Sequence, residues 1–348
     1  MIYYVSVNGN DEADGSKAAP FQTINHAAQI AAAGDTVRVF GGTYREWVNP
    51  KNGGTGNHNR IVYEAAEGEK PIIKGSEIAT DWEQLDGTVW KKAFPNQMFG
   101  DWNPFALEVE GDWFVEPVEH YRVHLGDVYI NGVSMFEAKS MEDLYDNTPR
   151  VTCCQNSWRV EDERILHPER TVYKWYAVVS DTVTTVYCNF QEYDPNNELI
   201  EINVRPCCFY PKATGVNYIT LRGFEIAQAA CPWTPPTAHQ IGMVGSHWSK
   251  GWIIENNVLH DAKCSALSLG KEESTGHNLH SRFHRKSSYR HQLEAVFSAL
   301  QNGWDRDTVG SHIVRNNEIY DCGQNGIVGH LGCIFSRIEH NHIYNIGV

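Results

Sequence analysis

The sequence predicts an all-β protein: a right-handed parallel β-helix with an inserted antiparallel β-sandwich domain. Three observations favour this fold. Strand-and-turn copies recur in the last third of the chain, hairpin-like strands fill its middle, and one amphipathic helical segment lies near its start. These features divide the chain into a cap with the first coils of the β-helix (1–77), the inserted sandwich (78–209) and further coils (210–348).

Segment 1–77 alternates short strands with Gly-containing turns, and the expected strands are 3–7, 36–40, 60–64 and 71–74. Between the first two strands, an apolar face recurs at i, i+3, i+4 and i+7: Ile24, Ala27, Ala28 and Ala31. This spacing predicts a helix over 23–33, with Thr23 as its N-cap and Gly34 just beyond its end. We expect the helix to close the end of the solenoid, which otherwise exposes strand edges and core.

Residues 78–209 have a different character, since hairpin-like strands dominate: 127–130, 172–179, 183–190 and 198–204. Asn131-Gly132 is the strongest turn signal among them, because Asn-Gly suits the tight turns of two-residue hairpins. Strands joined by short turns predict an antiparallel sandwich.

The last third contains an internal repeat. Segment 254–267 aligns with 314–327, and a further copy begins at Ile338. Asn317 and Asn341 are one coil apart, whereas the stretch of chain from Asn257 to Asn317 is more than twice as long. One coil therefore carries an excursion, at 272–308. Inside it, apolar spacing predicts a helix that ends near Gly303; its members are Tyr289, Leu293, Val296, Phe297 and Leu300.

Stacked coils lie about 4.8 Å apart, so equivalent residues form ladders. We expect an asparagine ladder of Asn257, Asn317 and Asn341, whose amides bond the backbone of the next coil. Asp261 and Asp321 are also equivalent. They are either turn residues of each coil, the favoured interpretation, or a carboxylate pair near the roughly 5.5 Å separation of retaining glycosidases.

Composition limits the partners. The formal net charge of −14 argues against nucleic acid, whose binding depends on Lys and Arg. No apolar run approaches the roughly 20 residues that span a bilayer, so no membrane partner is expected. The start lacks the basic and apolar regions of a signal peptide, and the nine cysteines show no metal-like spacing. Reduced thiols and a cytoplasmic location are therefore expected.

Several motifs narrow the interpretation further. Segment 14–46 is typical of right-handed β-helix proteins that act on carbohydrates. Other motifs cover nearly the whole chain: Gly111-Asp-Trp113, His124-Leu-Gly-Asp-Val-Tyr-Ile-Asn-Gly132, Trp248-Ser-Lys-Gly-Trp-Ile-Ile-Glu255, His260-Asp-Ala-Lys-Cys-Ser-Ala266 and Tyr320-Asp-Cys-Gly-Gln-Asn325. Together they resemble the β-xylosidases of glycoside hydrolase family 120. The resemblance implies retaining hydrolysis of xylosides, a xylose-containing oligosaccharide as partner, and no cofactor.

The resemblance also contains a departure. Chains of that family are longer, and it places the nucleophile Asp and the acid/base Glu in coils that would follow Val348. No residue here is therefore assigned as catalytic, and we expect a fragment, a natural truncation or half of a split protein. Such a chain is expected to show little activity alone, and to form a homo-oligomer or pair with a chain that supplies further coils.

Candidate substrate-binding residues follow from the repeat alignment and the motifs. The alignment places Lys271 and Glu272 beside His330 at the coil ends, where they either line a sugar pocket or form a solvated surface group. Trp113 either stacks on a sugar face or packs in the core. His124 and Asp127 are weaker candidates, favoured as hairpin structure.

No metal site is expected. His340-Asn-His342 places two His on one face of a strand, but two ligands without a third are a weak signal. The basic run 280–291 is interpreted as a solvated loop that leads into the helix.

Two other functions remain open beside the glycoside hydrolase. One is a polysaccharide lyase, which needs a Lys or Arg base and usually clustered acidic Ca²⁺ ligands; the repeats contain no such cluster. The other is a non-catalytic carbohydrate-binding or structural β-helix.

Overall fold

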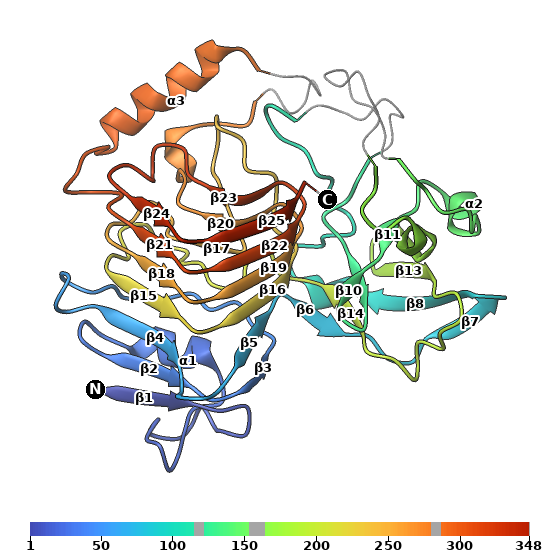
Figure 1. The fold of residues 1–348 in the computed structure, drawn as a ribbon, viewed down its shortest axis with the longest axis horizontal. Coiled ribbons are helices and arrows are strands. Elements are labelled where there is room, and N and C mark those ends of the chain that lie inside the picture. Colours follow the sequence, from blue (N-terminus) through green and yellow to red (C-terminus); the bar gives the residue numbers. More distant parts are fainter. Residues whose placement is uncertain (115–121, 153–163, 280–286, 348) are drawn as a thin grey trace.

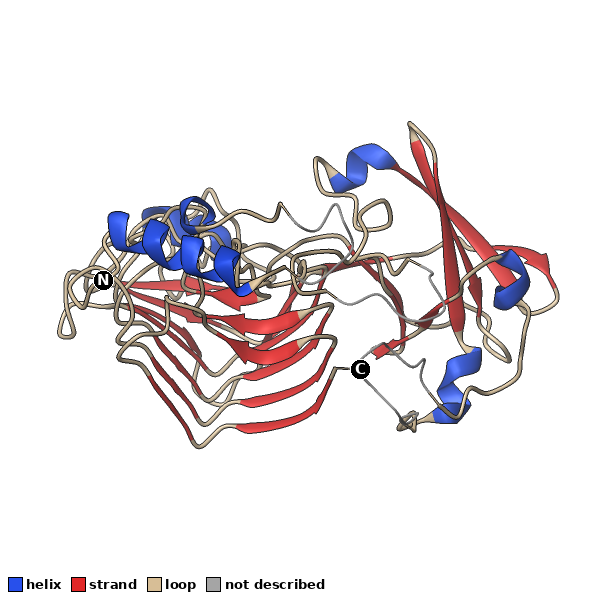
Figure 2. Ribbon diagram, turned by 90° about the horizontal axis from the view of Figure 1, so that it is seen from above, coloured by secondary structure: helices blue, strands red, loops and turns tan. Residues whose placement is uncertain are grey.

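A computed structural model describes residues 1–114, 122–152, 164–279 and 287–347. It contains a parallel β-helix and, beside it, an antiparallel unit built from the middle of the chain; Figures 1 and 2 show the two side by side. The predicted all-β fold, a parallel β-helix with an inserted antiparallel domain, is confirmed.

Three parallel sheets form the β-helix. The first has the strand order β1 (Ile2–Val5), β2 (Thr36–Val39), β4 (Ile61–Ala65), β15 (Ile219–Arg222), β18 (Ile253–Glu255), β21 (Ile313–Arg315) and β24 (Arg337–Glu339). The second consists of β3 (Gly42–Tyr44), β5 (Pro71–Lys74), β16 (Glu225–Ala229), β19 (Val258–Ala262), β22 (Glu318–Cys322) and β25 (His342–Ile346). The third consists of β17 (Val244–Gly245), β20 (Ser265–Ser268) and β23 (Asn325–Val328).

The solenoid core is a set of stacked side chains. One stack runs through five neighbouring strands in register, and its members are all fully buried: Val37, Tyr63, Leu221, Ile254 and Val314. Because each strand turns alternate residues inward, one apolar residue per coil is enough to continue the stack.

The asparagine ladder is confirmed. Asn257 Nδ2 donates to Asn317 Oδ1 at 3.1 Å, and Asn317 Nδ2 donates to Asn341 Oδ1 at 2.9 Å. The same oxygens accept the backbone N–H groups of Asn257 and Asn317. Each amide thus joins its own coil to the next.

A second ladder occupies the bend at the end of the second sheet. Gln228, Asp261, Asp321 and Asn345 are equivalent by register, and their φ angles lie between 50° and 62°. Asp and Asn tolerate this left-handed conformation better than most residues. Asp261 and Asp321 therefore have the turn role that the sequence favoured.

Helix α1 (Ile24–Ile30) packs on the first coil through Ile24, Ala27 and Ala28, all buried. The Thr23 side chain caps it by accepting from His26 N, as predicted. The helix ends at Ile30, earlier than predicted, because Asp35 Oδ2 accepts the Ala32 N–H that a longer helix needs.

The antiparallel unit contains two sheets. One has the order β10 (Val133–Ser134), β9 (Val128–Ile130), β14 (Ile200–Asn203) and β6 (Ser76–Ile78); the other has β11 (Phe136–Glu137), β12 (Lys174–Val179), β13 (Val183–Asn189), β8 (Val89–Pro95) and β7 (Glu83–Asp86). Short helices connect them: η1 (Asn96–Phe99), α2 (Met141–Leu144) and η2 (Pro168–Val172). Both sheets contribute to one core, for example Ile202 from the first and Trp175 from the second, which makes the unit a sandwich.

The excursion carries η3 (Glu273–Thr275) and α3 (Tyr289–Gln301), close to the predicted helix. Its buried residues are Ala295 and Ala299, whereas four large apolar side chains are between 55% and 69% exposed: Tyr289, Leu293, Phe297 and Leu300. Four of the five apolar residues that predicted this helix therefore face outward, and the fifth, Val296, packs against a small core with Trp248 and Leu331. Residues 280–286 of the basic run lie outside the described residues.

None of the described helices has the length and apolar character that crossing a bilayer requires. The cysteines of the described ranges are free thiols, and all but Cys333 are buried.

Candidate functional site

A loop of the antiparallel unit docks on the β-helix at Gly111–Trp113. Asp112 N donates to Asn278 Oδ1 at 2.6 Å, Thr237 Oγ1 donates to Asp112 Oδ2 at 2.8 Å, and Trp233 Nε1 donates to the Asp112 carbonyl at 3.2 Å. A Cβ on Gly111 would lie 2.5 Å from the Trp233 ring, so only glycine permits this approach. The loop is thus fixed against the coil segment 233–240.

Trp113 lies at this junction, half-buried, with a φ angle of 72°. Its ring meets that of Tyr289 on α3 edge-on, with centroids 5.4 Å apart. A bulky residue with positive φ is a strained position, and such strain persists only where neighbouring contacts hold it. The contacts of Asp112 hold it here.

Lys271 lies near Asp112 of this junction and is fully buried. Its ammonium group donates to the Pro236 carbonyl. Burial lowers the pKa of Lys271 to about 7, although the negative charge of Asp112 opposes the shift. Lys271 therefore bonds the segment on which the loop docks and does not reach the surface.

His330 is held from two sides. Its backbone N–H donates to Gln240 Oε1 at 3.1 Å, and its Nε2 lies 3.3 Å from Gln292 Nε2 on α3. Because an amide nitrogen only donates, His330 Nε2 accepts and Nδ1 carries the proton. Burial, with Lys271 nearby, lowers the pKa of His330 to about 4, so the ring is neutral. The Nδ1–H is buried and has no hydrogen-bond partner among the described residues.

Glu272 has a different position from the other three predicted residues. Its carboxylate caps η3, accepting from Ser274 N at 2.9 Å and from the Ser274 hydroxyl at 2.5 Å. The structure thus brings Trp113, Lys271 and His330 together around segment 233–240 and α3, while Glu272 organises the start of the excursion.

The sequence did not indicate the polar cluster beside these residues. Thr234 Oγ1 lies 2.7 Å from Ser265 Oγ, Asn325 Nδ2 donates to Ser265 Oγ at 3.0 Å, and Gln324 Oε1 accepts from Thr234 N at 2.9 Å. Segment 232–237 carries no repeat signal, because it belongs to a loop between coils. Only the register of β20 and β23 shows that these groups meet.

A cavity of about 1020 Å³ lies between η1 and the first coils. The His239 and His247 rings stack there, 5.0 Å apart at 21°, and Tyr210 Oη lies 3.0 Å from His239 Nε2. Burial lowers the pKa of His239 to about 4 and also lowers that of His247. The two lowered pKa values make both rings neutral at pH 7, and they add uncharged aromatic faces to a cavity lining that also contains charged residues: Glu77, Asp101, Arg205, Lys212 and Glu273.

The antiparallel unit matches a known protein family. Residues 79–202 match the family described as glycoside hydrolase 120, insertion domain. A solved structure, that of XylC in complex with xylose, covers the whole chain with a TM-score of 0.96 and 53% sequence identity. The antiparallel unit is a glycoside hydrolase 120 insertion domain, and the chain as a whole is similar to XylC. The chain covers 54% of the XylC chain, about half its length.

Short segments of the chain also match other proteins. Residues 7–51 match a family of unknown function, DUF1565. Over 76 residues the chain is 42% identical to the uncharacterised protein YwoF of Bacillus subtilis, and over 87 residues it is 38% identical to pectate lyase PEL9 of Emericella nidulans. These stretches are 22% and 25% of the chain, and 16% and 21% of the two relatives. They concern short segments only.

The predicted hairpin residues His124 and Asp127 have structural contacts within the insertion domain. His124 Nδ1 lies 2.5 Å from Glu137 Oε1, and this hydrogen bond raises the pKa of His124. Asp127 accepts from Val128 N at 3.0 Å and from Ser134 Oγ at 3.0 Å, and is only 8% exposed. Burial raises the pKa of Asp127 to about 6; Lys263 opposes the shift and Asp261 adds to it.

Replacing Asp127 by Asn is expected to stabilise the protein at pH 7.5 by up to about 3 kcal/mol, since each pKa unit is worth about 1.4 kcal/mol. Between the ordinary pKa of an aspartate and about 6, the folded protein keeps a proton that the unfolded chain has lost. Wild-type stability therefore falls as pH rises through this window and stays lower above it. Urea unfolding of both proteins from pH 4 to 8 measures this, with the exposed Asp81→Asn as control. A difference that does not grow with pH contradicts it.

Proposed function

We propose that this chain serves in a glycoside hydrolase that acts on xylosides and xylo-oligosaccharides, and that the surface around Trp113 and His330, here called the sugar wall, binds a xylosyl unit. One observation carries the proposal: the chain is 53% identical over its whole length to XylC, whose structure contains xylose. The resemblance to family 120 β-xylosidases implies that hydrolysis retains configuration.

The chemistry of the sugar wall supports a neutral ligand. Trp113 offers an aromatic face for a sugar ring, and the buried His330 Nδ1–H is a donor suited to a hydroxyl oxygen. The imidazole is neutral, and the buried Lys271 beside it is already bonded to Pro236 and lies near Asp112. A lyase acting on uronates needs accessible cations beside its substrate, and Lys271, the described cation next to His330, is buried, which favours a glycoside hydrolase over a lyase.

The cavity beside η1 favours an oligosaccharide over a monosaccharide as the ligand, because it offers room for further sugar units. Segment 233–241 separates it from the sugar wall, because His239 faces the cavity while Gln240 holds His330. We propose that further sugar units lie along this segment, against Tyr210 and the two stacked histidines. Aromatic and neutral polar groups are the usual lining of such sites.

Replacing Trp113 by Ala is expected to weaken xylobiose binding about 30-fold, because truncating an aromatic anchor costs about 2 kcal/mol. Isothermal titration calorimetry with xylobiose measures this. Tyr145→Ala is the matched control, since Tyr145 is 41% exposed and lies in the antiparallel unit. Equal affinities of wild type and Trp113→Ala contradict the assignment of the sugar wall.

Hydrolysis of an aryl β-xyloside distinguishes the functions themselves. Release of the aryl group supports the glycoside hydrolase, whereas an unsaturated, ultraviolet-absorbing product from polygalacturonate supports the lyase. Sugar binding without turnover of either substrate is the result expected of this chain alone, both as part of a longer hydrolase and as a non-catalytic binding protein.

Association with a second copy or with a partner chain stays a proposal, and the cytoplasmic location stays a prediction. The exposed apolar side chains of α3 are the surface that supports association. They share one helix, so α3 is the first candidate interface.

A further inference from the structure

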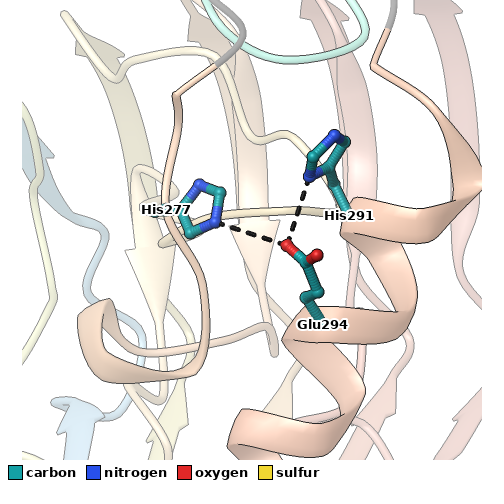
Figure 3. Close-up of side chains that lie close together, drawn as sticks. All are labelled: His277, His291 and Glu294. Atoms are coloured by element: carbon teal, nitrogen blue, oxygen red, sulfur yellow. Dashed lines mark hydrogen bonds and ion pairs between the residues drawn. The ribbon is translucent and has the colours of Figure 1, made fainter.

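Three potential metal ligands meet beside the sugar wall: His277, His291 and Glu294 (Figure 3). His277 follows η3, whereas His291 and Glu294 lie one turn apart on α3 and point toward it. Glu294 Oε2 lies 3.2 Å from His291 Nδ1 and 3.8 Å from His277 Nε2. All three ligand atoms lie within 4.8 Å of one another.

We propose that these three side chains bind Zn²⁺. Two imidazoles and a carboxylate form a ligand set that zinc uses, and a water completes the tetrahedron. Zinc lies about 2.1 Å from each such ligand, so two ligands of a tetrahedral ion are about 3.4 Å apart. The two shorter separations are close to this value, and partly exposed side chains close the third by small rotations.

The fold already holds both halves of the site. Asn278, next to His277, accepts from Asp112 N at 2.6 Å. At the other end of α3, Asn302 Nδ2 donates to Ser274 Oγ at 2.7 Å, which ties the helix to η3. Because the two segments are anchored without metal, binding requires ordering of side chains only.

Glu294 keeps an oxygen for the metal. Arg290 Nε lies 3.3 Å from Glu294 Oε1, and Arg290 is 82% exposed, so this pair is weak and involves the other oxygen. A divalent cation binds more tightly when one of its ligands is negatively charged, and the Glu294 carboxylate supplies that charge.

The position of the site suggests its effect. The first two turns of α3 also carry Tyr289, which contacts the Trp113 ring, and Gln292, which contacts His330. A zinc ion that joins His277 to α3 therefore fixes the helix against the sugar wall. This effect rests on the proposed function, whereas zinc binding itself does not.

Calorimetric titration of the purified chain with Zn²⁺ tests the site, and Co²⁺ reports its geometry by the intense visible bands of tetrahedral coordination. We expect one ion per chain. Loss of a residue that only orients a metal ligand weakens metal affinity about 10- to 100-fold. Loss of a direct ligand, in His291→Ala or Glu294→Gln, is therefore expected to lower the zinc affinity about 100-fold or more. The ligand side chains are 22% to 43% exposed, so their replacement leaves the core intact.

Two histidine variants serve as controls. His58→Ala removes an exposed imidazole that lies far from the cluster in sequence, and is expected to bind zinc like wild type. His342→Ala tests the rival pair His340 and His342. Zinc affinity that is unchanged in His291→Ala, or lost in His342→Ala, overturns the proposal.

Xylobiose titrations with and without zinc test the effect on the sugar wall separately. A several-fold tighter affinity with zinc, absent in Glu294→Gln, supports it. If zinc binds as expected but xylobiose affinity does not change, the positioning role is wrong and the zinc site stands. If no variant or wild type binds xylobiose at all, the proposed function fails instead.

Discussion

Replacing Glu201 by Gln is expected to lower the free energy of unfolding by about 3–5 kcal/mol, the usual cost of breaking a buried ion pair. Glu201 is fully buried on β14. Its carboxylate accepts from Lys74 at 2.8 Å and from Gln228 at 3.0 Å on the β-helix, and pairs with Arg45 at 2.6 Å. Glutamine keeps the shape but leaves two partly buried cations without their anion.

Urea unfolding with calorimetry checks this result. Because Glu201 joins the antiparallel unit to three strands or turns of the β-helix, the variant is expected to unfold in two separate steps. Burial alone would raise the pKa of Glu201, but its bonds to Lys74, Arg45 and Gln228 lower it. Its stabilising effect is thus lost at acid pH, as the carboxylate is protonated.

A matched control is Glu83→Gln. Glu83 lies 3.2 Å from Lys91 on β7 and β8, but it is 74% exposed. Exposed pairs contribute about 1 kcal/mol or less, so the change should be small. A comparable loss in the two variants would mean that burial of Glu201 is not the cause.

Replacing Asn317 by Leu is expected to cost about 3–5 kcal/mol. The amide of Asn317 bonds the Asn257 backbone, the Asn257 side chain, the Ile254 carbonyl and Asn341. Leucine has a similar size, so the loss is not one of volume. It leaves buried donors and acceptors without partners, at about 1–3 kcal/mol each.

Chemical denaturation of Asn317→Leu measures this loss, with Asn197→Leu as control. Asn197 is exposed, and its side chain bonds the nearby Asp194. Its replacement should change stability by about 0.5 kcal/mol or less. If Asn317→Leu lowers the free energy of unfolding no more than Asn197→Leu does, the ladder sets the register of the coils but adds little stability.

The solenoid was predictable because its rules are local. Inward apolar residues and one turn amide recur in each coil, so the alignment of 254–267, 314–327 and the copy that begins at Ile338 revealed coil length, ladder and excursion. The early end of α1 was not predictable in this way. It depends on the side chain of Asp35, which takes the Ala32 N–H.

The candidate site was predictable only in part. Trp113, Lys271 and His330 were found by family resemblance and by coil equivalence, and they lie around the same segment, 233–240, and helix α3. The cap formed by Glu272 depends on Ser274 in η3, and the position of the Lys271 ammonium depends on Pro236. Neither η3 nor segment 233–240 follows the repeat. The apolar stripe of α3 shows the same limit: periodicity predicted the helix but not which face packs.

The pairing of β6 with β14 has a consequence for how the chain reaches its fold. Ser76 and Asn203 face each other across these antiparallel strands, although more than a third of the chain separates them. Closing an unstructured loop of that length costs about 4 kcal/mol in chain entropy. Once the antiparallel unit has folded, the two ends of this loop are already close together. The chain that leaves β14 can then place β15 beside β4, where Ile219 pairs with Ile61. The first coils are therefore expected to pair with the later coils only after the antiparallel unit has folded. A variant that slows folding of the antiparallel unit should slow completion of the whole solenoid.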